Sequence, residues 1–335
     1  MARPRIEPKV WRPPRMPDRA RHSRGPEPFP AMTVLPVGGK GPEDVVADGE
    51  GRIFTGVEDG RILRITLDSG EVSVVADTRG RPLGLEVLAD GRLLVCDTRR
   101  GLLRIDPASG VTEVLVEEAG GERLRFCSNA VAAADGTIYF TESTRRFGFE
   151  FWMADILEHS DTGRLLRRDA DGSVEVLLDG LSFANGVTLA ADESFLIFAE
   201  TGAYRLSRYW LTGERAGQSE VIADNLPGSP DNISRGSDGR VWVAIPSARD
   251  ARLDLVLGLN PVIRKAMWAL PPRLQAKAKR TVWVLGVGQD GSILRDLQAP
   301  GTDYSFVTGV CEYGGRLCLG SITEHAIAVL DLPPA

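Results

Sequence analysis

Asp238-Gly239-Arg240-Val241-Trp242-Val243 places an Asp-Gly turn directly before an apolar, β-branched strand, which is a strong signal for a β-hairpin. Self-similar stretches of this kind occur six times: Asp48–Phe54, Asp90–Leu94, Asp135–Phe140, Asp192–Phe198, Asp238–Val243 and Gly314–Leu319. Apart from one stretched interval, they recur every 40 to 60 residues or so, which is the usual period of propeller blades.

A second hairpin follows each of the first ones. Three such strand pairs are plain in the sequence: Arg61–Thr66 with Val72–Ala76, Leu102–Ile105 with Thr112–Val116, and Leu165–Asp169 with Val174–Leu178. Four strands in each of six repeats predict an all-β fold, a six-bladed β-propeller over residues 31–335. Only Ala326–Leu330 remains after the sixth turn, so we expect Met32–Val37 to supply the missing strand and close the ring.

Two segments fall outside the repeats. Residues 252–280 stretch the fifth blade, and their pattern predicts a turn and two short helices. They hold seven basic residues and one acid among apolar side chains, so we expect a helical cap or lid, with a peripheral membrane contact as the other interpretation. Residues 1–30 carry eight basic residues, three acids and many prolines, and they predict a disordered basic tail.

The composition is that of a globular protein, with 43% hydrophobic and 26% charged residues. The formal net charge is −6 although residues 1–30 are basic, so the body of the chain is acidic; this argues against nucleic acid as a partner and suits a cation. The cysteines (Cys96, Cys127, Cys311 and Cys318) show no CxxC spacing and are expected to be reduced and buried. We expect a cytoplasmic protein, because no apolar run approaches the roughly 18 residues of a membrane span and residues 1–30 lack the core of a secretory signal.

One position in each blade is expected to point at the central tunnel, because the first strand of every blade lines it. Counting back six or seven residues from each turn gives Glu43, Asn129, Asn185 and Asp231 in blades one, three, four and five, with Leu83 or Gly84 in blade two and Thr308 in blade six. Buried carboxylates that face one another repel unless a cation or a proton compensates them. Two carboxylates and two amide oxygens suit Ca²⁺ better than Mg²⁺, and the lack of Cys and His disfavours zinc. Taken singly, each residue could have a purely structural role, such as a turn at Asn185-Gly186. Their common distance from the turn of each blade favours the calcium site.

The chain resembles the SMP-30/gluconolactonase and strictosidine synthase-like superfamily, on the branch that contains adipocyte plasma membrane-associated protein. The resemblance covers about residues 32–330 and rests on these stretches: Gly41-Pro42-Glu43, Cys127-Ser128-Asn129, Asp135–Thr141, Asp161–Leu166, Phe183–Val187, Ala199-Glu200-Thr201 and Pro227–Ile233. It implies a six-bladed fold with a calcium ion in the tunnel, and by position it implies that Glu43, Asn129, Asn185 and Asp231 are the metal ligands of a hydrolytic member.

The leading functional hypothesis is a calcium-dependent lactonase or arylesterase that acts on a small-molecule lactone or ester. Asp231 would be its general base or its nucleophile, and the sequence leaves both roles open. A non-catalytic propeller with calcium as a structural plug is one alternative. A metal-free, strictosidine synthase-like condensing enzyme is another, but the region in which that enzyme carries a catalytic glutamate reads Tyr304–Val310 here, without Glu. Glu142 and Glu200 are expected to make structural hydrogen bonds.

Overall fold

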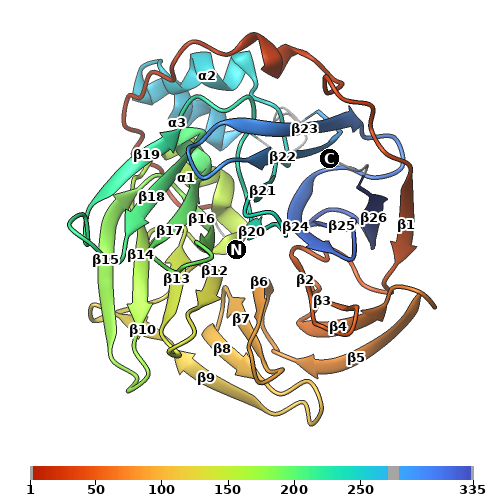
Figure 1. Cartoon of the computed structure of the whole chain (residues 1–335). Helices are drawn as coiled ribbons and strands as arrows, with labels where there is room; N and C mark the ends of the chain where they lie inside the picture. Colours follow the sequence, from red (N-terminus) through yellow and green to blue (C-terminus); the bar gives the residue numbers. More distant parts are fainter. Residues whose placement is uncertain (1–2, 271–278, 333–335) are drawn as a thin grey trace.

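In the computed structural model, which describes residues 3–270 and 279–332, six four-stranded antiparallel sheets surround a central axis (Figure 1). Blades one to three consist of β2 (Val45–Ala47), β3 (Arg52–Gly56), β4 (Arg61–Thr66) and β5 (Glu71–Asp77); β6 (Pro82–Val87), β7 (Leu93–Asp97), β8 (Gly101–Ile105) and β9 (Thr112–Val116); and β12 (Cys127–Ala132), β13 (Ile138–Glu142), β14 (Gly163–Arg168) and β15 (Val174–Leu181). A two-stranded ribbon, β10 (Glu118–Ala119) and β11 (Glu122–Arg123), lies between blades two and three. The six-bladed prediction is confirmed.

Blade six is completed by a strand from the other end of the chain. Blades four to six consist of β16 (Ala184–Leu189), β17 (Phe195–Glu200), β18 (Arg205–Trp210) and β19 (Ser219–Ala223); β20 (Ile233–Arg235), β21 (Val241–Ala244), β22 (Thr281–Val287) and β23 (Ile293–Pro300); and β24 (Val307–Tyr313), β25 (Arg316–Ser321), β26 (Ala326–Asp331) and β1 (Met32–Pro36). β1 pairs with β26 in antiparallel register, from Met32 opposite Leu330 to Pro36 opposite Ala326. The first and last strands therefore close the ring, as the sequence predicted.

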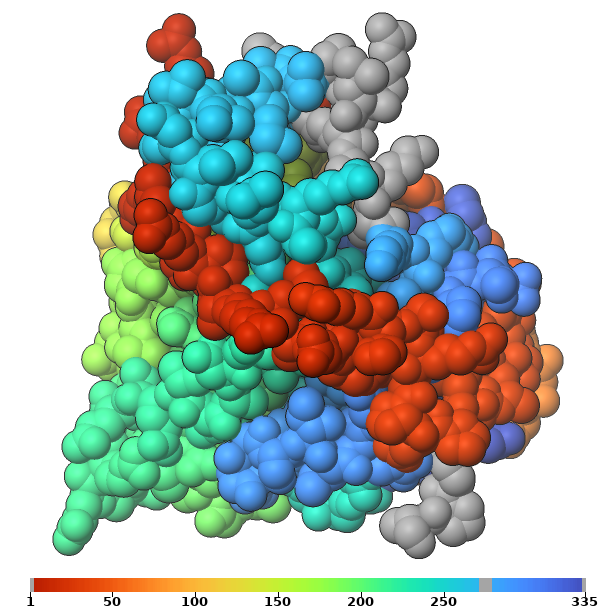
Figure 2. Space-filling model, turned by 90° about the horizontal axis from the view of Figure 1, so that it is seen from above, coloured from red at the N-terminus to blue at the C-terminus, as the bar shows by residue number. Residues whose placement is uncertain are grey.

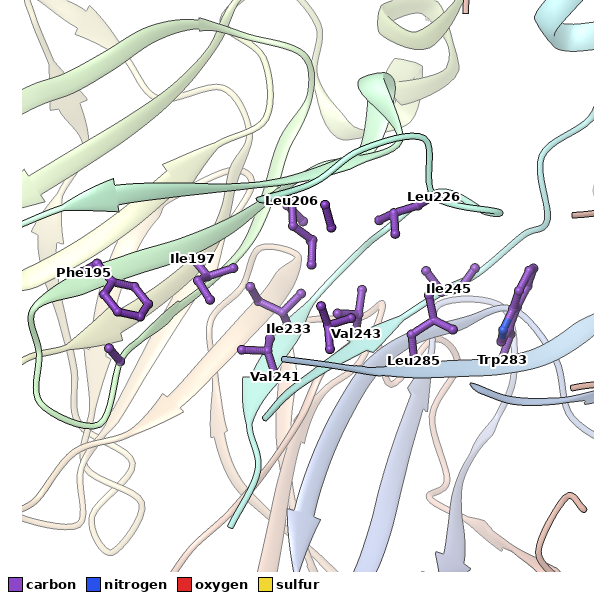
Figure 3. Packing of buried hydrophobic residues seen from close by; sticks show 14 residues of the cluster. Phe195, Ile197, Leu206, Leu226, Ile233, Val241, Val243, Ile245, Trp283 and Leu285 are labelled. Atoms are coloured by element: carbon purple, nitrogen blue, oxygen red, sulfur yellow. The ribbon is translucent and has the colours of Figure 1, made fainter. Parts of the chain in front are cut away.

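The hydrophobic core lies between neighbouring blades. Figure 3 shows the cluster between blades four and five, where Phe195 and Ile197 of β17 face Ile233, Val243 and other residues of blade five. Successive residues of an inner strand serve different interfaces: Val45 packs with blade six, and Val46 packs with blade two. This alternation follows from the period of two along a strand, and it lets every blade bury both of its faces.

The loops at one end of the ring carry the helices. η2 (Phe149–Phe151) and α1 (Trp152–Glu158) lie between β13 and β14, η3 (Thr201–Ala203) follows β17, and α2 (Ala251–Leu257) and α3 (Pro261–Ala269) lie between β21 and β22. The two short helices predicted for the blade-five insert are present, whereas residues 271–278 of that insert fall outside the described residues. The Asp250 and Asn260 side chains cap the helices by accepting backbone N–H bonds.

The three α-helices form a cap on one face of the ring. Leu157, Trp268 and Phe147 pack together with Ile6 of the N-terminal segment, while Leu255 and Val262 are 65% and 69% exposed. Within the described parts of the chain, no helix is long and apolar enough to cross a membrane. The peripheral membrane contact and the cytoplasmic location stay predictions.

Residues 3–30 run as a strap over the cap and blade five, a defined path in place of the disordered tail that composition predicted (Figure 2). The N–H groups of Lys9 and Trp11 donate to the carbonyls of Glu158 and Leu257. Further along, Arg19 donates from Nη2 to the Asp296 carboxylate at 2.7 Å and forms an ion pair with it. These partners are distant in sequence, which is why local composition does not reveal them.

Blades two, four and six contribute a glycine where blades one, three and five contribute a polar side chain. A Cβ on Gly186 would lie 2.3 Å from the Ile233 nitrogen and 2.7 Å from the Asn232 Cα. Gly84 approaches the Asn129 Cα and Gly309 the Asp44 Cα just as closely. Glycine therefore lets each even-numbered blade press its backbone against the next blade at the tunnel.

Gly186→Ala tests this close approach. Because the new methyl group meets backbone atoms that cannot rotate away, we expect a loss of about 1–3 kcal/mol in the free energy of unfolding, measured by urea denaturation. Gly49→Ala is the matched control, since nothing lies within 4 Å of its Cβ position. Equal stability of the two variants would contradict the packing described.

Candidate metal and active site in the central tunnel

The candidate site lies at the end of the ring where the inner strands begin. Cys127, at the start of β12, pairs with Glu142, at the end of β13, so the loop that carries η2 and α1 leaves from this end. Two successive residues per blade form two layers here, which we call the mouth layer and the plug layer. The mouth layer contains Glu43, Leu83, Ser128, Asn185, Asp231 and Thr308. The plug layer contains Asp44, Asn129 and Asn232 and the three glycines Gly84, Gly186 and Gly309.

The plug layer is held by hydrogen bonds between alternate blades. Asn129 donates from Nδ2 to Asn232 Oδ1 at 3.1 Å and to Asp44 Oδ2 at 3.3 Å. Asp44 Oδ2 also accepts the N–H of Leu85, and Asn129 Oδ1 accepts the N–H of Val187. Side chains from blades one, three and five thus meet one another and bond the backbones of blades two and four.

The mouth layer adds a second polar network. Asn185 donates from Nδ2 to Asp231 Oδ1 at 2.6 Å, and its Oδ1 accepts from Ser128 Oγ at 3.0 Å. Asn232 of the plug layer donates to Glu43 Oε1 at 2.9 Å and links the layers. Thr308 Oγ donates to the Glu43 carbonyl, which fixes the backbone of blade one against blade six.

Burial dominates the electrostatics of this end of the tunnel. It raises the pKa of Asp231 to about 8 and the pKa of Asp44 to about 7, although hydrogen bonds from Asn185 and from backbone N–H groups oppose the shift. Burial, together with the Asp231 and Asp44 charges, raises the pKa of Glu43 well above its ordinary value. Three carboxyl groups that repel one another when ionised are therefore buried at this end of the tunnel.

The donor atoms fit a hard cation. Glu43 Oε2 is buried and has no hydrogen-bond partner among the described residues, so this oxygen is unsatisfied without a proton or an ion. The neighbouring donors are carboxylate, amide and hydroxyl oxygens, the ligands that Ca²⁺ takes in proteins. No group of three or more His, Cys, Asp or Glu in the described chain is arranged to hold a metal ion, so any such site here depends on the amides of Asn185 and its neighbours.

The structure brings the four predicted residues together, but not in one layer. Glu43, Asn185 and Asp231 share the mouth layer, whereas Asn129 lies one residue deeper, and Ser128 takes the corresponding place in blade three. Asp44 and Asn232 were missed, although each directly follows a predicted ligand in the sequence. The metal-binding role of all four predicted residues stays a prediction.

Two other acids have structural roles. Glu142 accepts from Arg164 Nη2 at 2.5 Å and from the Arg125 N–H. Glu200 accepts from Arg205 and from Ser207 Oγ. Both carboxylates are buried and paired, as the sequence predicted.

Aromatic residues pack around Leu83 of the mouth layer. Leu83, Phe126 and Phe183 are buried together, with Phe149 of η2 and Ile156 of α1 packed against them. Two surface hollows of about 510 and 380 Å³ lie elsewhere, one beside Arg79 and Arg100 and the other between the strap and α3; no tunnel residue lines either of them. Apolar side chains thus line the mouth on the side of blades two, three and four.

The protein is a six-bladed β-propeller, a fold that it shares with gluconolactonases. The gluconolactonase of Xanthomonas campestris superposes with a TM-score of 0.66 over 99% of both chains at 20% identity. Regucalcin of Agrobacterium tumefaciens, a calcium-binding protein, superposes with a TM-score of 0.63 over 90% of this chain and 94% of its own, at 19% identity.

Sequence similarity gives the family. Residues 129–214 match the strictosidine synthase family, and residues 31–65 match the N-terminal region of strictosidine synthase-like proteins. Adipocyte plasma membrane-associated protein of Gallus gallus is 34% identical over 87% of this chain and 75% of its own length. STRICTOSIDINE SYNTHASE-LIKE 10 of Arabidopsis thaliana is 34% identical over 91% of this chain and 89% of its own. The chain belongs to the strictosidine synthase-like family.

The raised carboxyl pKa values predict a stability that depends on pH and on calcium. The folded chain keeps its carboxyl protons to higher pH than the unfolded chain, whose carboxyl pKa values are near 4. In EDTA, stability should therefore fall as the pH rises from about 5 towards 8. At pH 8, calcium at 100 times its Kd should add about 2.7 kcal/mol to the free energy of unfolding. At pH 5.5 the gain should be smaller, and the shift in Tm measures both.

Glu43→Gln should remove most of this calcium effect, while Glu71→Gln, an exposed carboxylate on β5, should keep it. Equal Tm values with EDTA and with calcium at pH 8 would show that protons alone compensate the mouth layer.

Proposed function

We propose that the protein is a calcium-dependent hydrolase that opens a lactone or cleaves an ester at the mouth of its tunnel. The observation that carries this proposal is the burial of Glu43 and Asp231 in one layer, where Glu43 Oε2 has no hydrogen-bond partner in the part of the chain described. The fold shared with a gluconolactonase and a calcium-binding regucalcin supports it by analogy.

The residues that would hold the ion are Glu43, Asn185 and Asp231, with Asn129 one layer deeper. A bound calcium ion supplies Lewis-acid polarisation of the substrate carbonyl group and charge compensation for the carboxylates. Asn185 orients Asp231 through the 2.6 Å bond to Oδ1, and the aromatic residues at the mouth exclude bulk water from the reacting groups.

Asp231 serves the hydrolysis in one of two ways. As general base it takes a proton from a water molecule whose oxygen bonds to the acyl carbon; the bond from that carbon to the ester oxygen breaks, and the proton passes to the departing alkoxide. As nucleophile its carboxylate oxygen bonds to the acyl carbon, the bond from that carbon to the ester oxygen breaks, and the departing alkoxide takes a proton from water; the hydroxide so formed then cleaves the acyl anhydride and restores the Asp231 carboxylate. Both routes need Asp231 ionised, and a cation beside it favours that form.

A calcium-plugged, non-catalytic propeller is the second candidate, favoured by the apolar packing at the mouth. Phe126, Phe149 and Phe183 pack with Leu83 of the mouth layer, and neither of the two surface hollows is lined by a tunnel residue. The described residues Tyr304–Val310 give no support to a metal-free condensing enzyme. Thr308 donates to the Glu43 carbonyl, and Tyr304 is buried and donates to the Leu319 carbonyl, so both hydroxyl groups have structural partners.

The test is hydrolysis of a panel of aliphatic lactones and phenyl esters, with calcium and with EDTA. We expect chelation and Asp231→Asn each to lower kcat/KM at least 100-fold, as loss of a general base or nucleophile does. Glu71→Gln should keep full activity.

Activity that survives both chelation and Asp231→Asn would contradict the mechanism. No turnover of any substrate, together with a calcium-dependent Tm, would support the calcium-plugged propeller instead.

A further inference from the structure

Arg81 is a buried cation that forms no ion pair with any acid of the described chain. It belongs to blade two, two residues before Leu83, and only 2% of it is exposed. Its Nη2 donates to the Gly41 carbonyl of blade one at 3.0 Å. Its Nε and Nη1 have no hydrogen-bond partner among the described residues. Most of the donor capacity of this guanidinium is thus unused at the tunnel mouth.

Two other buried arginines pair with carboxylates, whereas Arg264, away from the mouth layer, donates to the Leu157 and Lys9 carbonyls. Arg164 uses Nε and Nη2 on the Glu142 carboxylate and Nη1 on the Ala119 carbonyl. Arg249 likewise pairs with the Asp254 carboxylate. Arg81 has no ion pair within 4 Å in the part of the chain described, and Glu43, Glu58 and Asp97 act on it only through longer-range charge interactions. A buried charge with this few partners is costly, which indicates that a ligand group completes its coordination.

The surroundings of Arg81 are aromatic. Its Cζ lies 5.4 Å from the centroid of the Phe149 ring. Phe126 packs edge-on against Phe149 at 5.7 Å and against Phe183 at 5.4 Å. Leu83, in the mouth layer, belongs to the same cluster. A cation without an ion pair among the described residues therefore lies beside an apolar wall, within reach of the Glu43 charge.

We propose that Arg81 and the aromatic residues around it form a subsite for hydrophobic carboxylates, of the aryl- or alkyl-carboxylic acid class. The unpartnered N–H groups of Arg81 donate to the carboxylate, and the carbon skeleton packs against Leu83, Phe126 and Phe183. The claim that such a molecule is the substrate or the product rests on the proposed hydrolase function. Its binding at the mouth is independent of that function.

Phe149 occupies this subsite in the structure described. It comes from η2, in the loop between β13 and β14, and it is less buried than Phe126 and Phe183. In the conformation described, the Phe149 ring makes the aromatic and cation–π contacts. A bound ligand takes over these contacts once Phe149 has moved away. Ligand entry therefore requires Phe149 to leave Arg81.

The experiment is calorimetric titration of the full chain with 3-phenylpropionate and with its neutral analogue 3-phenylpropionamide. We expect the carboxylate to bind at least tenfold more tightly, because only the charged group satisfies Arg81. Arg81→Gln should abolish that preference, and Arg79→Gln, an exposed arginine two residues earlier, should keep it. Equal binding of both compounds, or binding by Arg81→Gln like that of the unaltered protein, overturns the proposal.

Phe149→Ala keeps the test decisive if Arg81→Gln does not fold. It removes a ring at the edge of the cluster, so the carboxylate should bind at least as tightly as to the unaltered protein, with a faster association rate. No binding of the carboxylate to either protein would mean that water alone satisfies Arg81, and it overturns the proposal.

Hydrolysis is measured separately on the same samples. Carboxylate binding without turnover contradicts the hydrolase function and leaves the subsite standing, whereas turnover without a preference for the carboxylate contradicts only the subsite.

Discussion

Three buried carboxyl groups around one axis are the constraint on which the rest of this structure depends. Glu43, Asp44 and Asp231 come from blades one and five, and the closed ring brings them into two adjacent layers. Removed from water, such groups remain ionised only if hydrogen bonds or a cation compensate them. The amides of Asn129, Asn185 and Asn232 supply the hydrogen bonds, but they leave Glu43 Oε2 unsatisfied.

The backbone of the ring is built to allow this concentration of polar groups. Gly84, Gly186 and Gly309 alternate with the polar residues of the plug layer, and each lets its blade approach the next one closely. The pairing of β1 with β26 then closes the ring, and the strap binds the cap helices to blade five. The loop that carries η2 and α1 in turn packs Phe149 against the cluster that contains Leu83 of the mouth layer and places its ring beside Arg81.

The sequence predicted the fold because its signal is local: Asp-Gly turns before apolar strands are read directly at Asp90 or Asp238. It predicted the site less fully because counting back from a turn is uncertain by one residue. Six residues lead back to Asn129 and seven to Ser128, and β12 contains a register shift between Cys127 and Ala130. The strap and Arg81 were beyond sequence reasoning, since their partners lie in other blades or in the cap.

A crystal structure of the protein grown with calcium, or with a lanthanide in its place, tests the central claim most directly. The account predicts an anomalous difference peak in the mouth layer, with oxygens of Glu43, Asn185 and Asp231 about 2.3–2.6 Å from the ion. A tunnel that contains only water, with Glu43 and Asp231 in the positions described here, would contradict it.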